Sequence, residues 1–168
     1  MITFSEHSLK LPGFTDSKPF SGLFEDERLV ASGFESGCNL AKKLDLTGAT
    51  NIQNASFGDA INQFQAGKDS KFKKFAKTAI KNGTDLQVQA WNFLAELDFG
   101  DVITYTELAE GVRRPIAVRS LASACKKNNH ILIIGCHRVV KKNGLVGKYA
   151  YGPELKTKLL HFESDLAN

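Results

Sequence analysis

The stretch that most constrains this chain is residues 131–140, ILIIGCHRVV. Four branched apolar residues run directly into Gly-Cys-His-Arg. An apolar run this short, bounded by residues that break regular structure, favours a buried strand over a helix. A thiol, an imidazole and a guanidinium then follow in consecutive positions, and neighbouring cations favour the thiolate, the nucleophilic form of cysteine. We therefore predict a buried strand that ends in a reactive cysteine, Cys136.

The length and composition are those of an ordinary globular protein. The 168 residues are 42% hydrophobic and 24% charged, which suits one domain or two small ones. No apolar run approaches the roughly 18 residues that a membrane span needs. The N-terminus has neither a basic nor an apolar region typical of a secretory signal, so we expect an intracellular protein with no membrane partner.

Cysteine usage argues against a metal site. The three cysteines are Cys38, Cys125 and Cys136, and neither a Cys-x-x-Cys nor a His-x3-His spacing occurs. In a reducing compartment all three are free thiols. Cys125 falls on an apolar helical stripe, which indicates a packed and inert thiol, so Cys136 is the candidate nucleophile.

Positive charge gathers in the second half of the chain. The net charge is +4, and between residues 113 and 148 there are nine basic residues and no acidic one. Two interpretations stay open, a solvated basic face and a nucleic-acid surface. The nine residues are Arg113, Arg114, Arg119, Lys126, Lys127, Arg138, Lys141, Lys142 and Lys148.

The first half predicts a small αβ region. Apolar segments at residues 20–24 and 29–34 flank a charged tip, which is typical of a hairpin. A short helix is expected over residues 38–44, and a second one with Ser56 as its N-cap. Residues 72–80 match both periodicities in part, and we assign them to a strand.

The second half predicts a helix-turn-helix. A helical stripe over residues 86–97 precedes a capping box formed by Thr104 and Glu107 at the start of a short helix. Pro115 suits the first turn of another helix, whose apolar face includes Ile116. Two short helices joined by a tight turn make a helix-turn-helix. Polar residues 81–84 precede this region, so we divide the chain into residues 1–81 and 82–168.

The C-terminal part predicts a turn, a loop and a last helix. Asn143-Gly144 suits a tight hairpin turn, an aromatic-glycine loop covers residues 147–152, and Pro153 opens the helix. Glu163 falls inside the apolar stripe of that helix. It either reaches solvent from the edge of the stripe or is buried with a partner, because an unpaired buried charge is very costly.

Cys136, His137 and Glu163 suggest covalent catalysis. Adjacent side chains on a strand point to opposite faces, so contact between Cys136 and His137 needs a bridging water or a break, which Gly135 makes plausible. A nucleophile, a base and a carboxylate that orients the base are the usual components of such sites. Acyl transfer is one outcome. Chemistry on nucleic acid is the other, and it would require the target nucleotide to leave the base stack.

The chain resembles the O6-alkylguanine-DNA alkyltransferases, also called methylated-DNA–protein-cysteine methyltransferases. The matching residues run in the family's order over about half of the chain. They are Gly83-Thr84, Gln87, Trp91, Phe99-Gly100, Thr104-Tyr105, Leu108-Ala109, Arg119, Asn128, Ile133 to Val140 with Cys136-His-Arg-Val, Gly147, Tyr149, Gly152, Leu159-Leu160 and Glu163.

The resemblance implies an α/β (α+β) fold. It consists of a small N-terminal αβ domain with an antiparallel sheet, packed on a mostly helical C-terminal domain with a winged helix-turn-helix. It also implies DNA repair by direct reversal, in one irreversible turnover that moves the alkyl group from O6 of guanine to Cys136. His137 would act as base through water, Glu163 would hold it, and Tyr105 would protonate the guanine. No cofactor and no metal are expected.

The resemblance also implies the partner and the residues that bind it. The partner is double-stranded DNA bearing O6-alkylguanine, bound by a monomer with little sequence preference. Arg119 would enter the duplex in place of the flipped nucleotide, and backbone carbonyls at Cys136 and Val139 would read the exocyclic amine of the base. The remaining DNA contacts would be Thr104, Ala117, Ser120 and Ser123, and the base pocket would comprise Asn128, Val139, Val146, Tyr149 and Ala150.

Two residues depart from the family pattern, and three other functions compete. Gly135 and Asn129 stand where the family usually has proline, and Gly135 predicts a less rigidly held Cys136. The competing functions are an alkyltransferase-like lesion sensor without chemistry, a winged-helix regulator and a Cys-His hydrolase. The location is nuclear if the source is eukaryotic and cytoplasmic otherwise.

Overall fold

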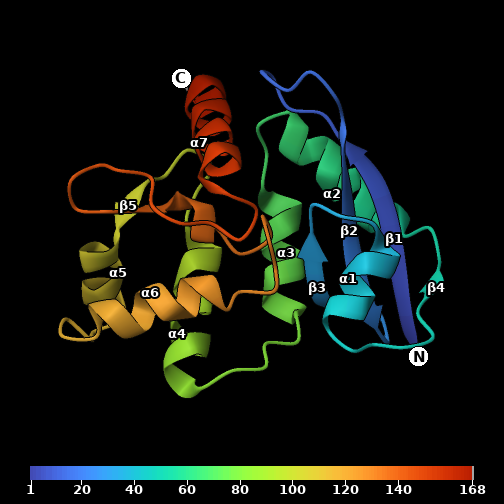
Figure 1. The fold of residues 1–168 in the computed structure, drawn as a ribbon, viewed down its shortest axis with the longest axis horizontal. Helices are drawn as coiled ribbons and strands as arrows, with labels where there is room; N and C mark the ends of the chain where they lie inside the picture. Colours follow the sequence, from blue (N-terminus) through green and yellow to red (C-terminus); the bar gives the residue numbers. More distant parts are fainter. Residues whose placement is uncertain (168) are drawn as a thin grey trace. The chain divides into compact units, whose positions relative to one another are not determined.

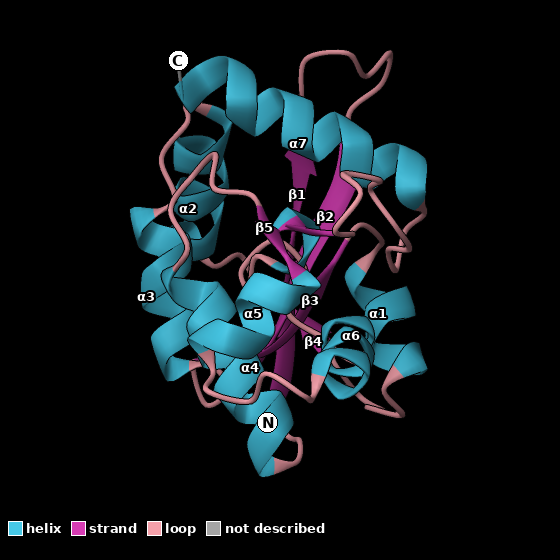
Figure 2. Ribbon diagram, turned by 90° about the vertical axis from the view of Figure 1, so that its left-hand side faces the viewer, coloured by secondary structure: helices cyan, strands magenta, loops and turns pink. Residues whose placement is uncertain are grey.

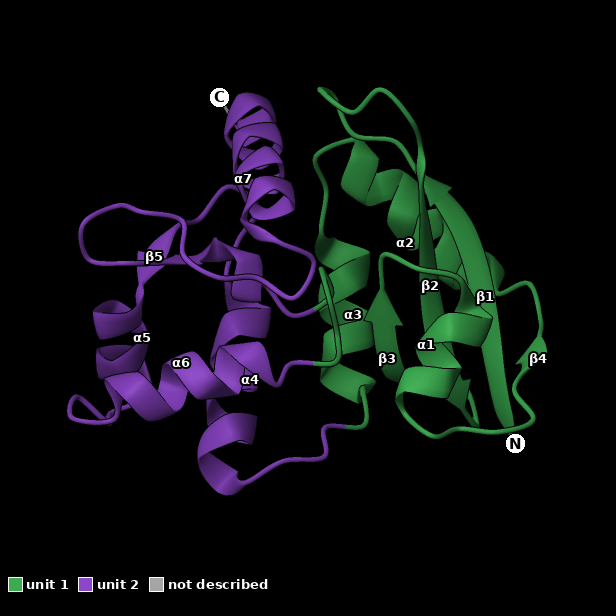
Figure 3. Ribbon diagram, viewed as in Figure 1, with its two compact units in different colours: residues 1–80, 129–133 green, residues 81–128, 134–168 purple. Residues whose placement is uncertain are grey.

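The computed structural model describes residues 1–167, which fall into two compact units (Figures 1 and 3). Unit 1 comprises residues 1–80 and 129–133, and unit 2 comprises residues 81–128 and the chain from residue 134 onward. The sequence suggested two contiguous domains. The return of residues 129–133 to unit 1 was not foreseen.

Unit 1 is built on a four-stranded sheet. The strand order is β3-β2-β1-β4, with β1 to β3 antiparallel and β4 parallel to β1. The predicted hairpin is confirmed, with Asp26 and Glu27 at positive φ as a two-residue hairpin turn requires. The strands are β1 (Ile2–Leu9), β2 (Lys18–Glu25), β3 (Arg28–Gly33) and β4 (Thr50–Asn51).

Helices cover both faces of this sheet, because side chains alternate along each strand. Leu23 of β2 packs in the cluster beneath α1, whereas Phe20 and Phe24 contact Phe57 of α2. Figure 2 shows the strands between α1 on one side and α2 and α3 on the other. The helices are α1 (Gly37–Lys43), α2 (Ala55–Gln65) and α3 (Ser70–Thr78).

Two assignments in the first half were wrong. The N-cap of α2 is Asn54, whose side chain accepts from the N–H of Phe57, and not Ser56. Residues 72–80 begin as helix α3 and not as a strand. The helical period prevails because it buries Phe72 and Ala76 together on one face.

The predicted buried strand before Cys136 is also wrong. The side chains of residues 131–134 are buried, but the backbone is a series of turns in which Leu132 has a φ of 64°. One bridge ties this segment to β3. The N–H of Ser32 donates to Asn129 O, and the N–H of Ile131 donates to Ser32 O. The apolar run is therefore a buried turn, and its first three residues, 131–133, belong to unit 1.

Unit 2 contains the helix-turn-helix, formed by α5 and α6. The capping box of Thr104 and Glu107 is confirmed at the start of α5. Pro115 was placed wrongly, because α6 begins only at Val118 and Ile116 is 99% exposed in the turn. The elements are α4 (Asp85–Glu96), β5 (Ile103–Thr104), α5 (Tyr105–Gly111), α6 (Val118–Lys126), η1 (Cys136–Arg138), β6 (Val139–Val140) and α7 (Pro153–Ala167).

The rest of unit 2 follows the expected pattern in part. β5 and β6 pair in parallel, a turn at Lys141–Gly144 follows, and Pro153 opens α7 as predicted. Leu145 and Val146 do not form a second hairpin strand after this turn. No helix within residues 1–167 is long and apolar enough to cross a membrane.

Candidate active site

A tight turn places Cys136 at the start of the short helix η1. The N–H of Cys136 donates to Ile134 O at 2.7 Å, and Gly135 between them has φ −69° and ψ 44°, close to an inverse γ-turn. A Cβ at residue 135 would lie 3.1 Å from Arg138 Cδ and 3.3 Å from Leu94 O. Glycine suits this position because the backbone turns against a fixed arginine side chain.

Glu163 is the centre of a buried polar cluster. It is 1% exposed, and its carboxylate accepts from His137 Nε2 at 2.7 Å and from Arg138 Nε at 2.8 Å and Nη2 at 3.1 Å. The N–H of Gly100 donates to it at 3.1 Å, while Arg138 Nη1 donates to Leu97 O. Of the two possibilities that the sequence left open, the buried and paired carboxylate is the correct one.

The charges of this cluster fix the state of His137. Burial alone would raise the pKa of Glu163, but its pairing with His137 and Arg138 outweighs this effect and lowers that pKa to about 2. Burial lowers the pKa of His137, so its imidazole is neutral. A carboxylate only accepts, so Nε2 carries the hydrogen. Nδ1 is then the basic nitrogen, and it has no hydrogen-bond partner among residues 1–167.

The groups that shift the pKa of the Cys136 thiol are not the ones that the sequence suggested. His137 Nε2 and the guanidinium of Arg138 are bonded to Glu163, and the imidazole is neutral, so these neighbours are not the cations that favour a thiolate. Burial raises the pKa of Cys136. A hydrogen bond from Asn128 Nδ2, 3.1 Å from Sγ, and the charge of Lys156 oppose this rise. Asn128 Nδ2 also lies 3.2 Å from Ile134 O, which ties the end of α6 to the reactive turn.

Lys156 is a site residue that the sequence analysis missed. Its side chain is 1% exposed, and Nζ donates to Val139 O at 2.5 Å. This carbonyl was expected to read the guanine amine, and it already accepts from the protein. Lys156 follows Leu155 in α7 and precedes Leu159 by three residues, so its helical position beside the apolar stripe was the signal that could have revealed it.

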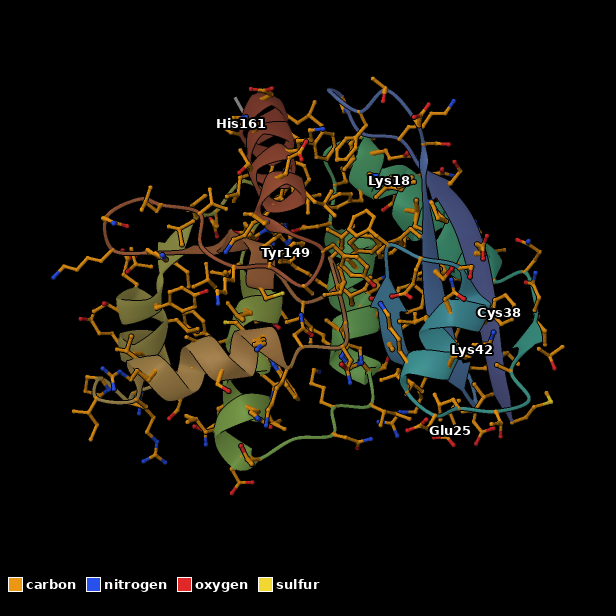
Figure 4. The ribbon with its side chains drawn as sticks, in the orientation of Figure 1. Lys18, Glu25, Cys38, Lys42, Tyr149 and His161 are labelled. Atoms are coloured by element: carbon orange, nitrogen blue, oxygen red, sulfur yellow. The ribbon has the colours of Figure 1, made fainter. Side chains whose placement is uncertain are left out.

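A cavity of about 470 Å³ opens onto Cys136. Tyr149, on the loop between β6 and α7 (Figure 4), has a hydroxyl that is enclosed and has no hydrogen-bond partner among residues 1–167. Burial raises the pKa of Tyr105 to about 12, so that phenol keeps its proton. Cys125, expected to be only packed, also lines the cavity. The lining residues are Tyr105, Ala122, Cys125, Lys126, Cys136, Lys141, Gly147, Lys148, Tyr149 and Ala150.

The structure brings together the predicted catalytic residues and part of the predicted base pocket. Val139 is fully buried in β6, and Val146 is half-buried outside the cavity lining. Arg119, Ser120 and Ser123 are exposed on α6. Among the remaining predicted contacts, Thr104 uses its hydroxyl in the capping box and Ala117 is the half-buried N-cap of α6.

Comparison with known proteins identifies the family. A family model described as "6-O-methylguanine DNA methyltransferase, DNA binding domain" matches residues 85–165. The methylated-DNA–protein-cysteine methyltransferase of Methanosarcina acetivorans is 32% identical over 139 residues, which cover 83% of this chain and 87% of that protein. This chain belongs to the methylated-DNA–protein-cysteine methyltransferase family.

Two further relatives show how far the likeness to known family members extends. The inducible methyltransferase of Bacillus subtilis is 36% identical over 95 residues, which span 56% of this chain and about half (53%) of that protein. The structure of Mycobacterium tuberculosis OGT in complex with DNA has a TM-score of 0.76 at 21% identity, covering 98% of this chain and 94% of that one. The mixed α and β fold predicted from the sequence is therefore confirmed as the fold of this family.

The hydrogen-bond partners of Glu163 explain why Arg138 is buried. From the sequence, Arg138 belonged to a basic run that was either a solvated face or a nucleic-acid surface. Its guanidinium bonds to the carboxylate and to Leu97 O, and the residue is only 4% exposed. Arg138 is therefore structural. Residues 1–167 contain no cluster of three or more His, Cys, Asp or Glu side chains arranged as metal ligands would be.

Proposed function

We propose that this protein repairs DNA by moving an alkyl group from O6 of guanine onto Cys136 in a single turnover. The observation that carries the proposal is the placement of one buried thiol at the wall of a cavity large enough for a purine base, about 470 Å³. The names of the relatives, and the solved relative bound to DNA, support the same reaction.

The chemistry follows from the site. The thiolate attacks the alkyl carbon, a carbon–sulfur bond forms, and the carbon–oxygen bond to O6 breaks with its electron pair passing to the guanine. His137 Nδ1 takes the thiol proton, directly or across one water, while Glu163 holds the ring. Tyr105, whose phenol is protonated before the reaction, supplies a proton to the leaving guanine, and the proton taken up by His137 replaces it through solvent. Cys136 ends as a thioether, so each molecule reacts once.

DNA is the proposed partner, and one chain supplies every group that reacts. α6 presents Arg119, Ser120 and Ser123 to the duplex, and Arg119 fills the gap that the flipped nucleotide leaves. Contacts to the sugar-phosphate backbone account for little sequence preference. The cavity, Cys136 and Glu163 all belong to unit 2, so we propose that the protein acts as a monomer.

A lesion sensor without chemistry is the less favoured alternative. Such a protein needs the cavity and the helix-turn-helix but neither a nucleophile nor a base. Here Cys136, His137 and Glu163 are all present, and two of them form a buried hydrogen-bonded pair at 2.7 Å. That pair would be a costly feature in a protein that only binds.

The reaction is tested with a duplex that contains O6-methylguanine, followed by digestion and mass spectrometry. We expect one methyl group on the Cys136 peptide and a repaired guanine. Cys136→Ser abolishes the transfer, whereas Cys125→Ser, a matched change in the same cavity, retains it. Unmodified protein beside unrepaired DNA, or methyl on Cys125, would contradict the proposal.

The role of Arg119 is tested by comparing two substrates. Arg119→Ala slows methyl transfer from the duplex more than transfer from the free base O6-methylguanine, because only the duplex leaves a gap to fill. Lys127→Ala, an exposed cation just after the same helix, serves as the control. Equal losses with both substrates would count against the finger role.

A further inference from the structure

The helix α3 of unit 1 carries a concentration of positive charge that the proposed reaction does not use. Between residues 68 and 81 the chain has six lysines and one acidic residue, Asp69. Four of these lysines lie on α3 itself and are called here the α3 lysine face: Lys71, Lys73, Lys74 and Lys77.

The fold turns this face outward. Phe72 and Ala76 point into unit 1, with Phe72 contacting Phe64 and Phe20, so the opposite side of the helix faces solvent. Lys74 and Lys77 are exposed, three residues apart and so neighbours on the helix surface. Lys71 pairs with Asp59. Within residues 1–167, neither Lys74 nor Lys77 forms an ion pair.

This charge pattern does not serve the stability of the helix. Like charges three or four residues apart on a helix surface, such as Lys74 and Lys77, repel each other and destabilise the helix. Only Lys77, in the last turn, gains from the helix dipole. A partner of opposite charge would offset the repulsion.

We propose that the α3 lysine face contacts the phosphate backbone of duplex DNA, as a second and sequence-independent contact surface in unit 1. The inference rests on the proposed function, because the reacting base is part of a duplex. Lysine is a compact point charge that neutralises phosphate without reading bases. An anionic membrane is disfavoured, because the apolar side of α3 is buried in unit 1 and leaves no apolar face to enter lipid.

The test is the salt dependence of binding to an undamaged duplex, measured by fluorescence anisotropy on the full chain. Three proteins are compared: the wild type, Lys74→Gln/Lys77→Gln, and the control Lys18→Gln/Lys42→Gln. Lys18 and Lys42 are exposed, lie on β2 and α1 of the same unit, and are labelled in Figure 4. Both double variants lose the same net charge, and glutamine is a good helix former.

We expect the α3 variant to flatten the slope of log K against log salt by roughly 0.9 for each phosphate that it no longer neutralises, about 1.8 for two. The control keeps the wild-type slope. Equal slopes in the two double variants, or a wild type that does not bind the duplex, would overturn the proposal.

Two further measurements separate this inference from the proposed function and from a membrane role. Both variants should accept methyl from the free base O6-methylguanine at the wild-type rate, which shows that they are folded. A wild type that accepts no methyl would refute the proposed function whatever the slopes are. If phosphatidylserine vesicles retain the wild type but not the α3 variant, and the DNA slopes are equal, the face binds lipid and the inference fails.

Discussion

At the scale of single residues, one carboxylate organises the reactive turn. Glu163 accepts hydrogen bonds from His137, from Arg138 and from the N–H of Gly100, so it fixes a side chain, a charge and a loop at once. Because the guanidinium of Arg138 compensates the negative charge of Glu163, His137 can remain neutral. The sequence placed Glu163 on an apolar stripe but did not show that Arg138 was its partner.

Because of Glu163, the free energy of unfolding is expected to fall at low pH. Its folded-state pKa of about 2 lies below the usual 4.5, so its contribution is fully present above about pH 4.5 and is lost as pH falls towards 2. Glu163→Gln leaves Arg138 buried without a counter-charge, which costs about 3–5 kcal/mol at pH 7. Urea unfolding at pH 7, 5 and 3 should show the wild type and the variant converging at the lowest pH.

The control for this change is Glu154→Gln on the same helix. Glu154 has an 86% exposed side chain and pairs with Lys158, so we expect a change within about 0.5 kcal/mol at every pH. A Glu163→Gln variant as stable as this control would contradict the buried ion pair.

Lys156 is expected to set the pH dependence of alkyl transfer. Its charge lowers the pKa of Cys136, so Lys156→Met raises that pKa and moves the rate profile to higher pH. Each unit of rise reduces the thiolate about tenfold at neutral pH. Methyl transfer rates from pH 6 to 9 measure the shift. The control Lys158→Met, two residues further along α7, should leave the pH profile of the rate unchanged. An unchanged profile for Lys156→Met would contradict the proposed effect of Lys156 on the pKa of Cys136.

At the scale of elements, the sequence predicted the first residue of a helix correctly where a side chain caps the backbone. The capping box at Thr104 involves residues only three apart, so its pattern is visible in the sequence. α6 has no such side-chain cap, and its start was predicted three residues too early, at Pro115 instead of Val118. α3 was missed because its alternating lysines and phenylalanines fit two periodicities, and only the buried aromatic cluster decides between them.

The capping box of α5 is expected to contribute measurably to stability. Thr104→Ala removes the acceptor for the Glu107 N–H, which costs about 1 kcal/mol. Thr106→Ala, within the first turn of α5 but with no capping role, is the matched control. Chemical denaturation of both variants measures the difference, and equal stabilities would show that the cap is dispensable.

At the scale of the whole molecule, the chain leaves unit 2 after Asn128, spends residues 129–133 in unit 1, and returns at Ile134. Ser32 binds this segment through three hydrogen bonds. Its N–H donates to Asn129 O, its carbonyl accepts from the N–H of Ile131, and its hydroxyl donates to Ile131 O at 2.8 Å. Residues 129–133, which end three positions before Cys136, therefore belong to unit 1, although Cys136 itself belongs to unit 2.

A fragment of residues 81–168 is accordingly expected to be unstable. Without unit 1, the side chains of Ile131, Leu132 and Ile133, now at most 4% exposed, would face water. Burying each such side chain is worth about 1.5–3 kcal/mol, which is a large part of a small domain's stability. The fragment should unfold at lower urea concentration than the full chain and transfer methyl slowly. A fragment as stable and active as the full chain would refute this dependence.

The sequence by itself determined the capping box, the hairpin, the helix-turn-helix and the family, because these depend on residue identity and on spacings of a few positions. It also singled out Cys136 as the candidate nucleophile and named Glu163 and Asn128. Only the tertiary structure decided the rest. Residues 131–134 are a turn because Ser32, about a hundred positions earlier, supplies their hydrogen bonds. Arg138 pairs with Glu163, and the charge of Lys156 lowers the pKa of Cys136, because α7 packs against η1. Charge and burial act through space, and no local pattern records which distant residues meet.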